Sequence, residues 1–308
     1  MLVRPLELED LESVVERVAL NLAGDAAQNP LINPTFSAEA FALALSQVRD
    51  ETWVAIGECG VVGHLYAALL ESLDHGNGAW VGPDGVSFDD EETLAAIYAT
   101  AGRAWVERGA LEHFVWVRDD EAAARPWLEL GFIRVHVRGV VELVDRARTS
   151  FAEEYRLRRG GLADLELALD LDRVLDEAER QGPSDSVPEE SATRREEWRE
   201  LLEDDEVHHY VVEFAGDAVA QCLTYPLSPR RGSFADTLHV SAVVVVPDHQ
   251  RRGVARALLD VALFDAHESG FRYAETNWRV TNSDAAHFWR RYGFVPTYVR
   301  LQRTIIAP

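Results

Sequence analysis

The sequence contains no lysine, so all 30 of its basic residues are arginines, and 53 acidic residues bring the formal net charge to −23. Such an acidic surface disfavours nucleic acids and anionic membranes as partners, because both are negatively charged. No apolar run approaches the roughly 20 residues of a membrane-spanning helix. The N-terminal Met1-Leu2-Val3-Arg4-Pro5 leads into acidic residues rather than into an apolar signal segment. We therefore predict a cytoplasmic protein that binds neither nucleic acid nor membranes.

Cysteine is also scarce. The two cysteines, Cys59 and Cys222, are far apart, and neither has a second cysteine or a histidine at metal-ligand spacing. This pattern predicts a reduced chain without a metal site. Hydrophobic residues make up 47% of the 308 residues, which is enough for a folded core, and the length favours two domains.

The two halves of the sequence repeat each other. Near the start of each half, Arg4 precedes Asp10 as Arg158 precedes Asp164, and an apolar-periodic stretch follows. The later parts match at five positions: Asp120, Ala123, Trp127 and Gly131-Phe132 have the spacing of Asn282, Ala285, Trp289 and Gly293-Phe294. In each copy, the glycine suits the end of a helix. Strand and helix patterns alternate in both halves, which predicts two α/β domains, residues 1–148 and 149–308.

A candidate anion site lies in the second half. A run of valines, residues 243–246, is typical of a buried strand, and Pro247 ends it. Gln250-Arg251-Arg252-Gly253-Val254-Ala255 then leads into a predicted helix, residues 256–266. The first amides of a helix have no helical partner, and Gly253 lets a phosphate approach them. The alternative is an ordinary strand-to-helix turn with solvated arginines.

Here the sequence resembles the GNAT superfamily of N-acetyltransferases. In that family, a strand ending in Val-x-Pro precedes a loop of the form Gln/Arg-x-x-Gly-x-Gly/Ala. Val245-Val246-Pro247 and Gln250-x-x-Gly253-x-Ala255 have both parts, and an Asn-x-x-Ala-x-x-x-Trp-x-x-x-Gly-Phe pattern begins at Asn282. The resemblance implies an α/β (α+β) fold of two tandem domains, each with a mixed, mostly antiparallel central sheet flanked by helices.

The resemblance also implies acetyl-CoA as the co-substrate, without a metal. Its pyrophosphate is expected on the turn, and its pantetheine arm between the valine strand and residues 273–277, which are expected to splay apart. Asn282 either contacts the arm or only caps its helix, and Trp289 packs against the coenzyme. The implied coenzyme-binding residues are Val243, Val244, Val245, Gln250, Arg251, Arg252, Gly253, Val254, Ala255, Arg256, Asn282 and Trp289.

The expected chemistry is direct attack of a primary amine on acetyl-CoA in a ternary complex, with a backbone amide at Val243 or Val244 stabilising the oxyanion. Many relatives place a glutamate base where this sequence has Ser241. His239 projects from the same face and titrates near neutral pH, so it is the candidate base unless it is only structural. Many relatives also place a tyrosine acid where Trp289 stands, which leaves Tyr292 as a candidate acid or a packing residue.

The first half is predicted to be a degenerate copy that does not bind coenzyme. Counting back from the helix-ending Gly109 and Gly270 aligns Asp89-Asp90-Glu91-Glu92 with Gln250-Arg251-Arg252-Gly253, and clustered carboxylates repel a diphosphate.

The expected acceptor is an amine of a small molecule or peptide, and the protein is expected to be a monomer or homodimer. A mycothiol-synthase-like acetyltransferase and a regulatory module that holds acyl-CoA without turnover are the alternatives.

Overall fold

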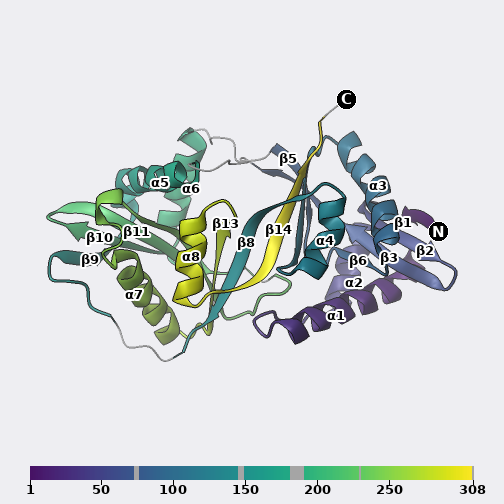
Figure 1. The fold of residues 1–308 in the computed structure, drawn as a ribbon, viewed down its shortest axis with the longest axis horizontal. Coiled ribbons are helices and arrows are strands. Elements are labelled where there is room, and N and C mark those ends of the chain that lie inside the picture. The colour runs from purple at the N-terminus through teal and green to yellow at the C-terminus, as the bar shows by residue number, and fades with distance from the viewer. Residues whose placement is uncertain (73–75, 145–148, 181–190, 229, 307–308) are drawn as a thin grey trace. The chain divides into compact units, whose positions relative to one another are not determined.

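The computed structural model describes residues 1–72, 76–144, 149–180, 191–228 and 230–306 (Figure 1). The chain forms two compact units. Unit 1 contains Met1–Val137, Arg230–Ser233 and the chain from Thr297 onward, and unit 2 contains Arg138–Pro229 and Phe234–Pro296. The predicted boundary between residues 148 and 149 adjoins residues 145–148, which lie outside the described part, so that boundary stays a prediction.

Unit 1 combines two groups of strands with four helices. One group has the order β1-β2-β3-β6, and the other has the order β4-β5-β7-β14. The strands are β1 (Leu2–Pro5), β2 (Thr52–Gly57), β3 (Gly60–Tyr66), β4 (Ala68–Ser72), β5 (Gly76–Val81), β6 (Val86–Phe88), β7 (Glu112–Arg118) and β14 (Val295–Thr304). The helices are α1 (Leu11–Gln28), α2 (Ala38–Gln47), α3 (Glu91–Glu107) and α4 (Glu121–Glu129).

Unit 2 continues from the second part of β8 (Ile133–Glu142), in the strand order β8-β13-β12-β11-β10-β9. Its other strands are β9 (Tyr155–Arg159), β10 (His208–Phe214), β11 (Asp217–Pro226), β12 (Thr237–Val245) and β13 (Tyr273–Arg279). Its helices are α5 (Leu165–Arg180), α6 (Ser191–Glu203), α7 (Val254–Glu268) and α8 (Ser283–Tyr292). β12 and β13 are parallel, whereas β9, β10, β11 and β12 pair in antiparallel fashion.

Helices α5 and α7 cover opposite faces of the unit 2 sheet. The Gln221 side chain donates to the Ala168 carbonyl of α5 at 3.1 Å, whereas the Tyr210 hydroxyl donates to Asp265 of α7 at 3.2 Å. Cys222, the register partner of Tyr210, follows Gln221 directly, and successive strand residues point to opposite faces. The α5 face packs Leu165, Ala168, Leu169, Trp198 and Leu223 into one apolar cluster.

The predicted repeat is confirmed in local structure. Each unit begins with a bidentate ion pair: Arg4 holds Asp10 at 2.6 and 3.1 Å, and Arg158 holds Asp164 at 2.8 and 3.0 Å. In both units the aspartate also accepts a backbone amide, at 2.9 Å from Glu7 and 3.0 Å from Gly161. The strand-to-helix entry is therefore built in the same way twice.

The second half of the repeat also matches. Asp120 and Asn282 are the N-caps of α4 and α8, and each side chain accepts the amide three residues on, at 2.9 Å. The tryptophan and phenylalanine rings lie 5.1 Å apart between Trp127 and Phe132 and 5.0 Å apart in the second copy. Within the described ranges, no helix has the length and apolarity needed to cross a bilayer.

At Gly139, β8 lies close to the Trp278 side chain of β13. A Cβ atom added there would stand 2.4 and 2.6 Å from ring carbons of Trp278, which is only 3% exposed. Gly24, inside α1, has no atom within 4 Å of an added Cβ, so it offers a control without steric conflict.

We expect Gly139→Val to destabilise the protein by about 1–3 kcal/mol, because an overpacked core must shift to admit the new side chain. Gly24→Ala should raise stability by up to about 1 kcal/mol, because glycine is costly inside a helix. Urea unfolding followed by tryptophan fluorescence measures both. An unchanged midpoint for Gly139→Val would contradict the close packing of these strands.

Candidate active site

The turn after β12 has an unusual backbone. The Val246 amide donates to the Val219 carbonyl at 2.9 Å, and the 3-10 turn Pro247–His249 follows. The Gln250 side chain then reaches back to the Val245 carbonyl at 2.9 Å. Arg251 has φ +58° and Gly253 has φ +84°, both in the left-handed region. Such alternation turns successive amides toward one side, which is the geometry of an anion-binding nest.

The N-terminus of α7 is open. Gly253 is its N-cap and has no side chain to accept the first-turn amides, and the first helical bond runs from the Ala257 amide to the Gly253 carbonyl at 2.9 Å. A Cβ atom added at Gly253 would meet nothing within 4 Å. The first-turn amides of α7 therefore have no acceptor within the helix, and the helix dipole favours an anion at this end.

Three arginines surround this corner. Arg251, Arg252 and Arg256 are exposed, and in the described part of the chain no ion pair engages them. Guanidinium groups pair well with phosphate oxygens in bidentate geometry. The predicted residues Gln250, Arg251, Arg252, Gly253, Val254, Ala255 and Arg256 are thus brought together at one helix end.

His249 anchors the turn, a role that the sequence did not suggest. The Tyr155 hydroxyl lies 3.0 Å from His249 Nδ1, and the Phe214 ring centroid lies 4.7 Å from that of His249. These partners come from β9 and β10, far away in the sequence. No local pattern could have identified them, because only the sheet order brings the three strands' ends together.

Strand β12 contains a bulge. Gln221 pairs with Val244 and Leu223 pairs with Ser241, so two residues, Ala242 and Val243, oppose Cys222. Ala242 has φ +48°, as expected of a bulge residue in the left-handed region. A bulge bends and twists its strand. Here it separates the Val243, Val244 and Val245 segment from the first part of β12.

β12 and β13 splay apart beyond one point. Their parallel register covers Thr237–Tyr273, Leu238–Ala274 and His239–Glu275, and it ends there. The Thr276 hydroxyl donates to the Val240 carbonyl at 3.0 Å, so a side chain replaces the next ladder bond. Past this rung, residues 241–245 are paired with β11 alone in the described register. An extended ligand could add to that edge as a strand does.

The residues expected from α8 have clear structural contacts. Asn282 caps the helix by accepting the Ala285 amide, and Trp289 is 6% exposed and packs on Phe294. The Tyr292 hydroxyl donates to Asp260 of α7 at 2.6 Å. Tyr292 therefore links α8 to α7, and its proton already has an acceptor.

His239 belongs to a row of polar side chains. It pairs with Tyr225 of β11 and Glu275 of β13, and directly opposed residues share one face of a sheet. The Tyr225 and His239 ring centroids lie 5.0 Å apart. Arg138 Nε of β8 lies 3.6 Å from Glu275 Oε1. Sequence reasoning found His239 and the neighbouring Ser241, and missed the other three.

Unit 1 differs at the equivalent corner. Asp90 is the N-cap of α3, and its carboxylate accepts the Thr93 amide at 2.8 Å, a hydrogen bond that lowers the pKa of Asp90. The alignment by counting back, which placed Glu92 opposite Gly253, is wrong by two positions, because α3 has 17 residues and α7 has 15. The start of α3 is acidic, as predicted, and the Asp90 carboxylate caps the first turn of its own helix.

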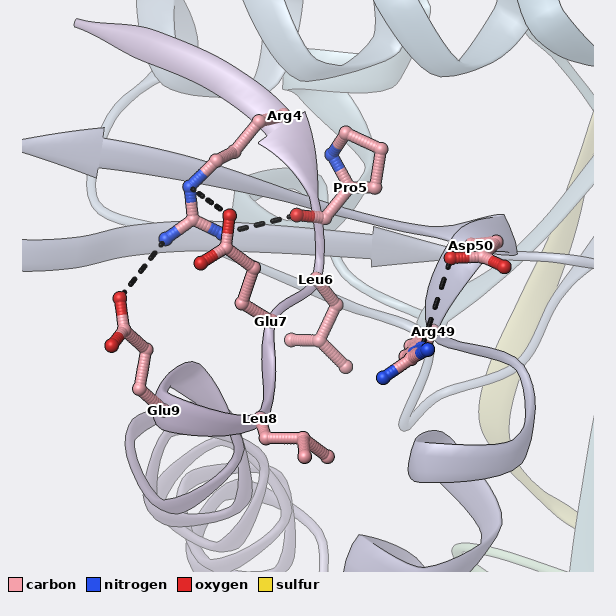
Figure 2. Close-up of a pocket in the computed structure, with 8 residues that line it drawn as sticks. All are labelled: Arg4, Pro5, Leu6, Glu7, Leu8, Glu9, Arg49 and Asp50. Carbon is pink, nitrogen blue, oxygen red and sulfur yellow. Dashed lines mark hydrogen bonds and ion pairs between the residues drawn. The ribbon is translucent and has the colours of Figure 1, made fainter.

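Unit 1 contains two pockets, and none of the residues of the candidate site lines either of them. One, of about 380 Å³, lies between α1, β7 and α4 and includes Asp25, Trp116 and Trp127. The other, of about 630 Å³, lies near the N-terminus, and Figure 2 shows its Arg4 beside Glu7 and Glu9. No group of His, Cys, Asp and Glu among the described residues is arranged to hold a metal ion.

Comparison with known proteins agrees with this geometry. The acetyltransferase (GNAT) family model matches residues 171–294, which include β12, the turn, α7, β13 and α8. This match confirms the resemblance found in the sequence. No curated protein sequence matches the chain at a significant level.

Two solved structures resemble the chain over its whole length. A GCN5-related N-acetyltransferase from Sphaerobacter thermophilus shares 17% identity with a TM-score of 0.64, covering 99% of this chain and 96% of that chain. A tandem GNAT protein from the clavulanic acid biosynthesis pathway, without AcCoA, shares 16% identity with a TM-score of 0.55, covering 100% and 99%. The predicted tandem GNAT fold, of mixed α/β class, is confirmed by these likenesses.

Cys222 offers a test of the bulge region. It is fully buried opposite Ala242 and Val243, and burial raises the pKa of its thiol to about 12. Cys59 is exposed. The thiolate, not the thiol, attacks the disulfide bond of a thiol-specific reagent, and burial both disfavours the Cys222 thiolate and blocks access to it.

We expect one thiol per chain to react rapidly in the native protein and two after unfolding in guanidinium. Cys59→Ser should leave no rapidly reacting thiol in the native state. Rapid modification of a second native thiol would show that the β11–β12 bulge opens.

Proposed function

We propose that this chain, whose residues 171–294 match the acetyltransferase (GNAT) family model, transfers an acetyl group from acetyl-CoA to a primary amine of a small molecule or peptide. The reaction is direct attack in a ternary complex, and unit 2 carries the site. Family membership supports acyl transfer from coenzyme A in general terms. The amine acceptor and the residue roles are our proposal.

The open N-terminus of α7 is the observation that carries this proposal. A diphosphate needs several donors on one side and little steric hindrance. The left-handed Arg251 and Gly253, the first-turn amides and the three exposed arginines supply both. We assign the coenzyme pyrophosphate to this corner.

The splayed strands support the place of the pantetheine arm. An arm leaving the turn can run along residues 243–245, whose edge is not paired with β13. Its amide groups then form main-chain hydrogen bonds as an added strand would. Asn282 and Trp289, at the two ends of α8, are assigned to the far side of the arm.

The bulge is suited to stabilise charge during transfer. The amine nitrogen attacks the thioester carbon, the C–N bond forms, and the carbonyl oxygen becomes an oxyanion. The Val243 or Val244 amide, turned by the left-handed Ala242, is assigned as its donor. The C–S bond then breaks, and coenzyme A leaves as a thiolate.

His239 is the proposed acceptor of the proton that the amine loses. It lies at the last paired rung of β12 and β13, where the arm ends in this arrangement. Ser241 lies on the same face and can carry a relay through water. A general acid is not essential, because an alkyl thiol has a pKa of about 8.5 and its thiolate leaves without prior protonation. Tyr292, already bonded to Asp260, is the weaker candidate acid.

A module that holds acyl-CoA without turnover is the second candidate. Ser241 and Trp289, which stand where many relatives place the base and the acid, are the observation that favours it. Both candidates predict coenzyme binding in unit 2, and only the enzyme predicts release of free thiol that depends on an acceptor.

We expect acetyl-CoA to release coenzyme A continuously only when one class of amine is present. A panel of aryl-alkyl amines, polyamines, aminoglycosides and peptide N-termini, read by a thiol-reactive dye, measures this release, and mass spectrometry identifies the acetylated product. Tight acetyl-CoA binding without release on any amine would favour the module. Absence of both binding and release would contradict the proposal.

We expect Gly253→Val to raise the dissociation constant of acetyl-CoA at least tenfold, a change of about 1.4 kcal/mol, because the branched side chain covers the amides. Gly270→Val is the matched control. Gly270 follows the other end of α7, has φ +93°, and has equally open surroundings. Both variants carry the same backbone strain, so only the first should lose affinity. Equal acetyl-CoA affinities of the two variants in titration calorimetry would contradict the assignment of the coenzyme pyrophosphate to this turn.

A further inference from the structure

Glu275 is a charged side chain in a buried place. Its side chain is 0% exposed and that of its ion-pair partner Arg138 is 4% exposed, with Arg138 Nε 3.6 Å from Glu275 Oε1. The desolvation of two charges can exceed their attraction, so a buried ion pair is a weak device for stability. Apolar residues of similar volume would fill the same space, and the charge therefore calls for another explanation.

The position of the Arg138–Glu275 pair explains why a charge is buried here. Glu275 is the register partner of His239, at the rung after which β12 and β13 separate. Directly opposed residues of neighbouring strands project from the same face, and Arg138 approaches Glu275 on that face. The Tyr225 ring packs on the other side of the His239 ring at 5.0 Å between centroids. In the sheet, His239 of β12 thus stands between Tyr225 of β11 and Glu275 of β13 on one face.

The spacing of this rung is fixed by neighbouring contacts. The Thr276 hydroxyl bonds to the Val240 carbonyl at 3.0 Å, and Thr276 is 3% exposed. On the other face, which is that of Glu275, Arg279 Nε donates to Glu179 of α5 at 2.8 Å. The β13 strand beside His239 is therefore held by one buried and one partly buried hydrogen bond, which fix the position of Glu275.

We propose that Glu275 is a positioning residue for His239, which it holds in one ring orientation and tautomer while its negative charge stabilises the imidazolium. This inference rests on the proposed function, in which His239 takes the proton of the attacking amine. In this proposal the proton stays on His239, and the charge of Arg138, 3.6 Å from Glu275, favours the ionised form of that carboxylate. The arrangement follows the general logic of a base oriented by a third group.

Three variants test this role: Glu275→Gln, His239→Gln and the double variant. Glutamine keeps the shape of glutamate and removes its charge. We expect Glu275→Gln to lower kcat about 10- to 100-fold, the range found when an orienting partner is removed, with acetyl-CoA affinity unchanged. The double variant should be no slower than His239→Gln, because residues that act as a unit are not additive.

Glu213→Gln is the control. Glu213 lies on β10 and its carboxylate is held by Arg158 at 2.6 Å, so this variant also removes the charge of an arginine-paired glutamate in the same sheet. It should leave kcat unchanged. Losses that multiply in the double variant, or a Glu275→Gln enzyme with unchanged kcat, would overturn the proposal.

A readout without turnover separates this inference from the proposed function. The ring ¹⁵N signals of His239, identified by their loss in His239→Gln, report its tautomer. We expect one tautomer in the unmodified protein and a mixture in Glu275→Gln. The same spectrum in both would refute the positioning role even if transfer occurs. A changed spectrum with no transfer to any amine would leave Glu275 beside His239 and reject the acetyltransferase assignment.

Discussion

The separation of β12 from β13 is the constraint on which the candidate site depends. Parallel pairing ends at His239 and Glu275, and the bulge at Ala242 turns the following segment away. One strand then serves three purposes. Its first part carries His239, its bulge aims an amide, and its end leads into the open turn. If β12 continued to pair with β13, the proposed pantetheine arm would have no free strand edge to bind, and the turn alone could not orient a thioester.

The two units share one fold and differ at one place, the N-terminus of α3 in unit 1 and of α7 in unit 2. Both retain the Arg–Asp pair at the first helix, the Asp or Asn cap, and the tryptophan–phenylalanine contact at the last helix. They differ at the helix after the central strands. α7 starts with a glycine in the left-handed region, whereas α3 starts with a carboxylate that accepts its own helix amide. The N-terminus of α7 therefore leaves its amide donors for an anion, whereas Asp90 accepts a hydrogen bond from one of the amides of α3.

The sequence predicted what depends on local chemistry. The turn, the caps and the repeat are readable because glycine, proline and asparagine restrict the backbone near themselves. The His249 contacts with Tyr155, and the row of Tyr225, Glu275 and Arg138, were not predicted. They depend on which strands become neighbours, and residue spacing alone does not fix that order.

The net charge of −23 does not prevent anion binding, because electrostatic interactions at the surface act over a short range. At physiological salt, exposed charges farther away than about 8 Å are largely screened. The carboxylates along α7 are also occupied: Asp260 accepts the Tyr292 hydroxyl, and Asp265 is paired with Arg159. Asp248 is an exposed acid in the turn, and Arg251 and Arg252 follow it closely in the sequence. The amides and arginines at the start of α7 therefore set the local potential, and an acidic protein can hold a diphosphate there.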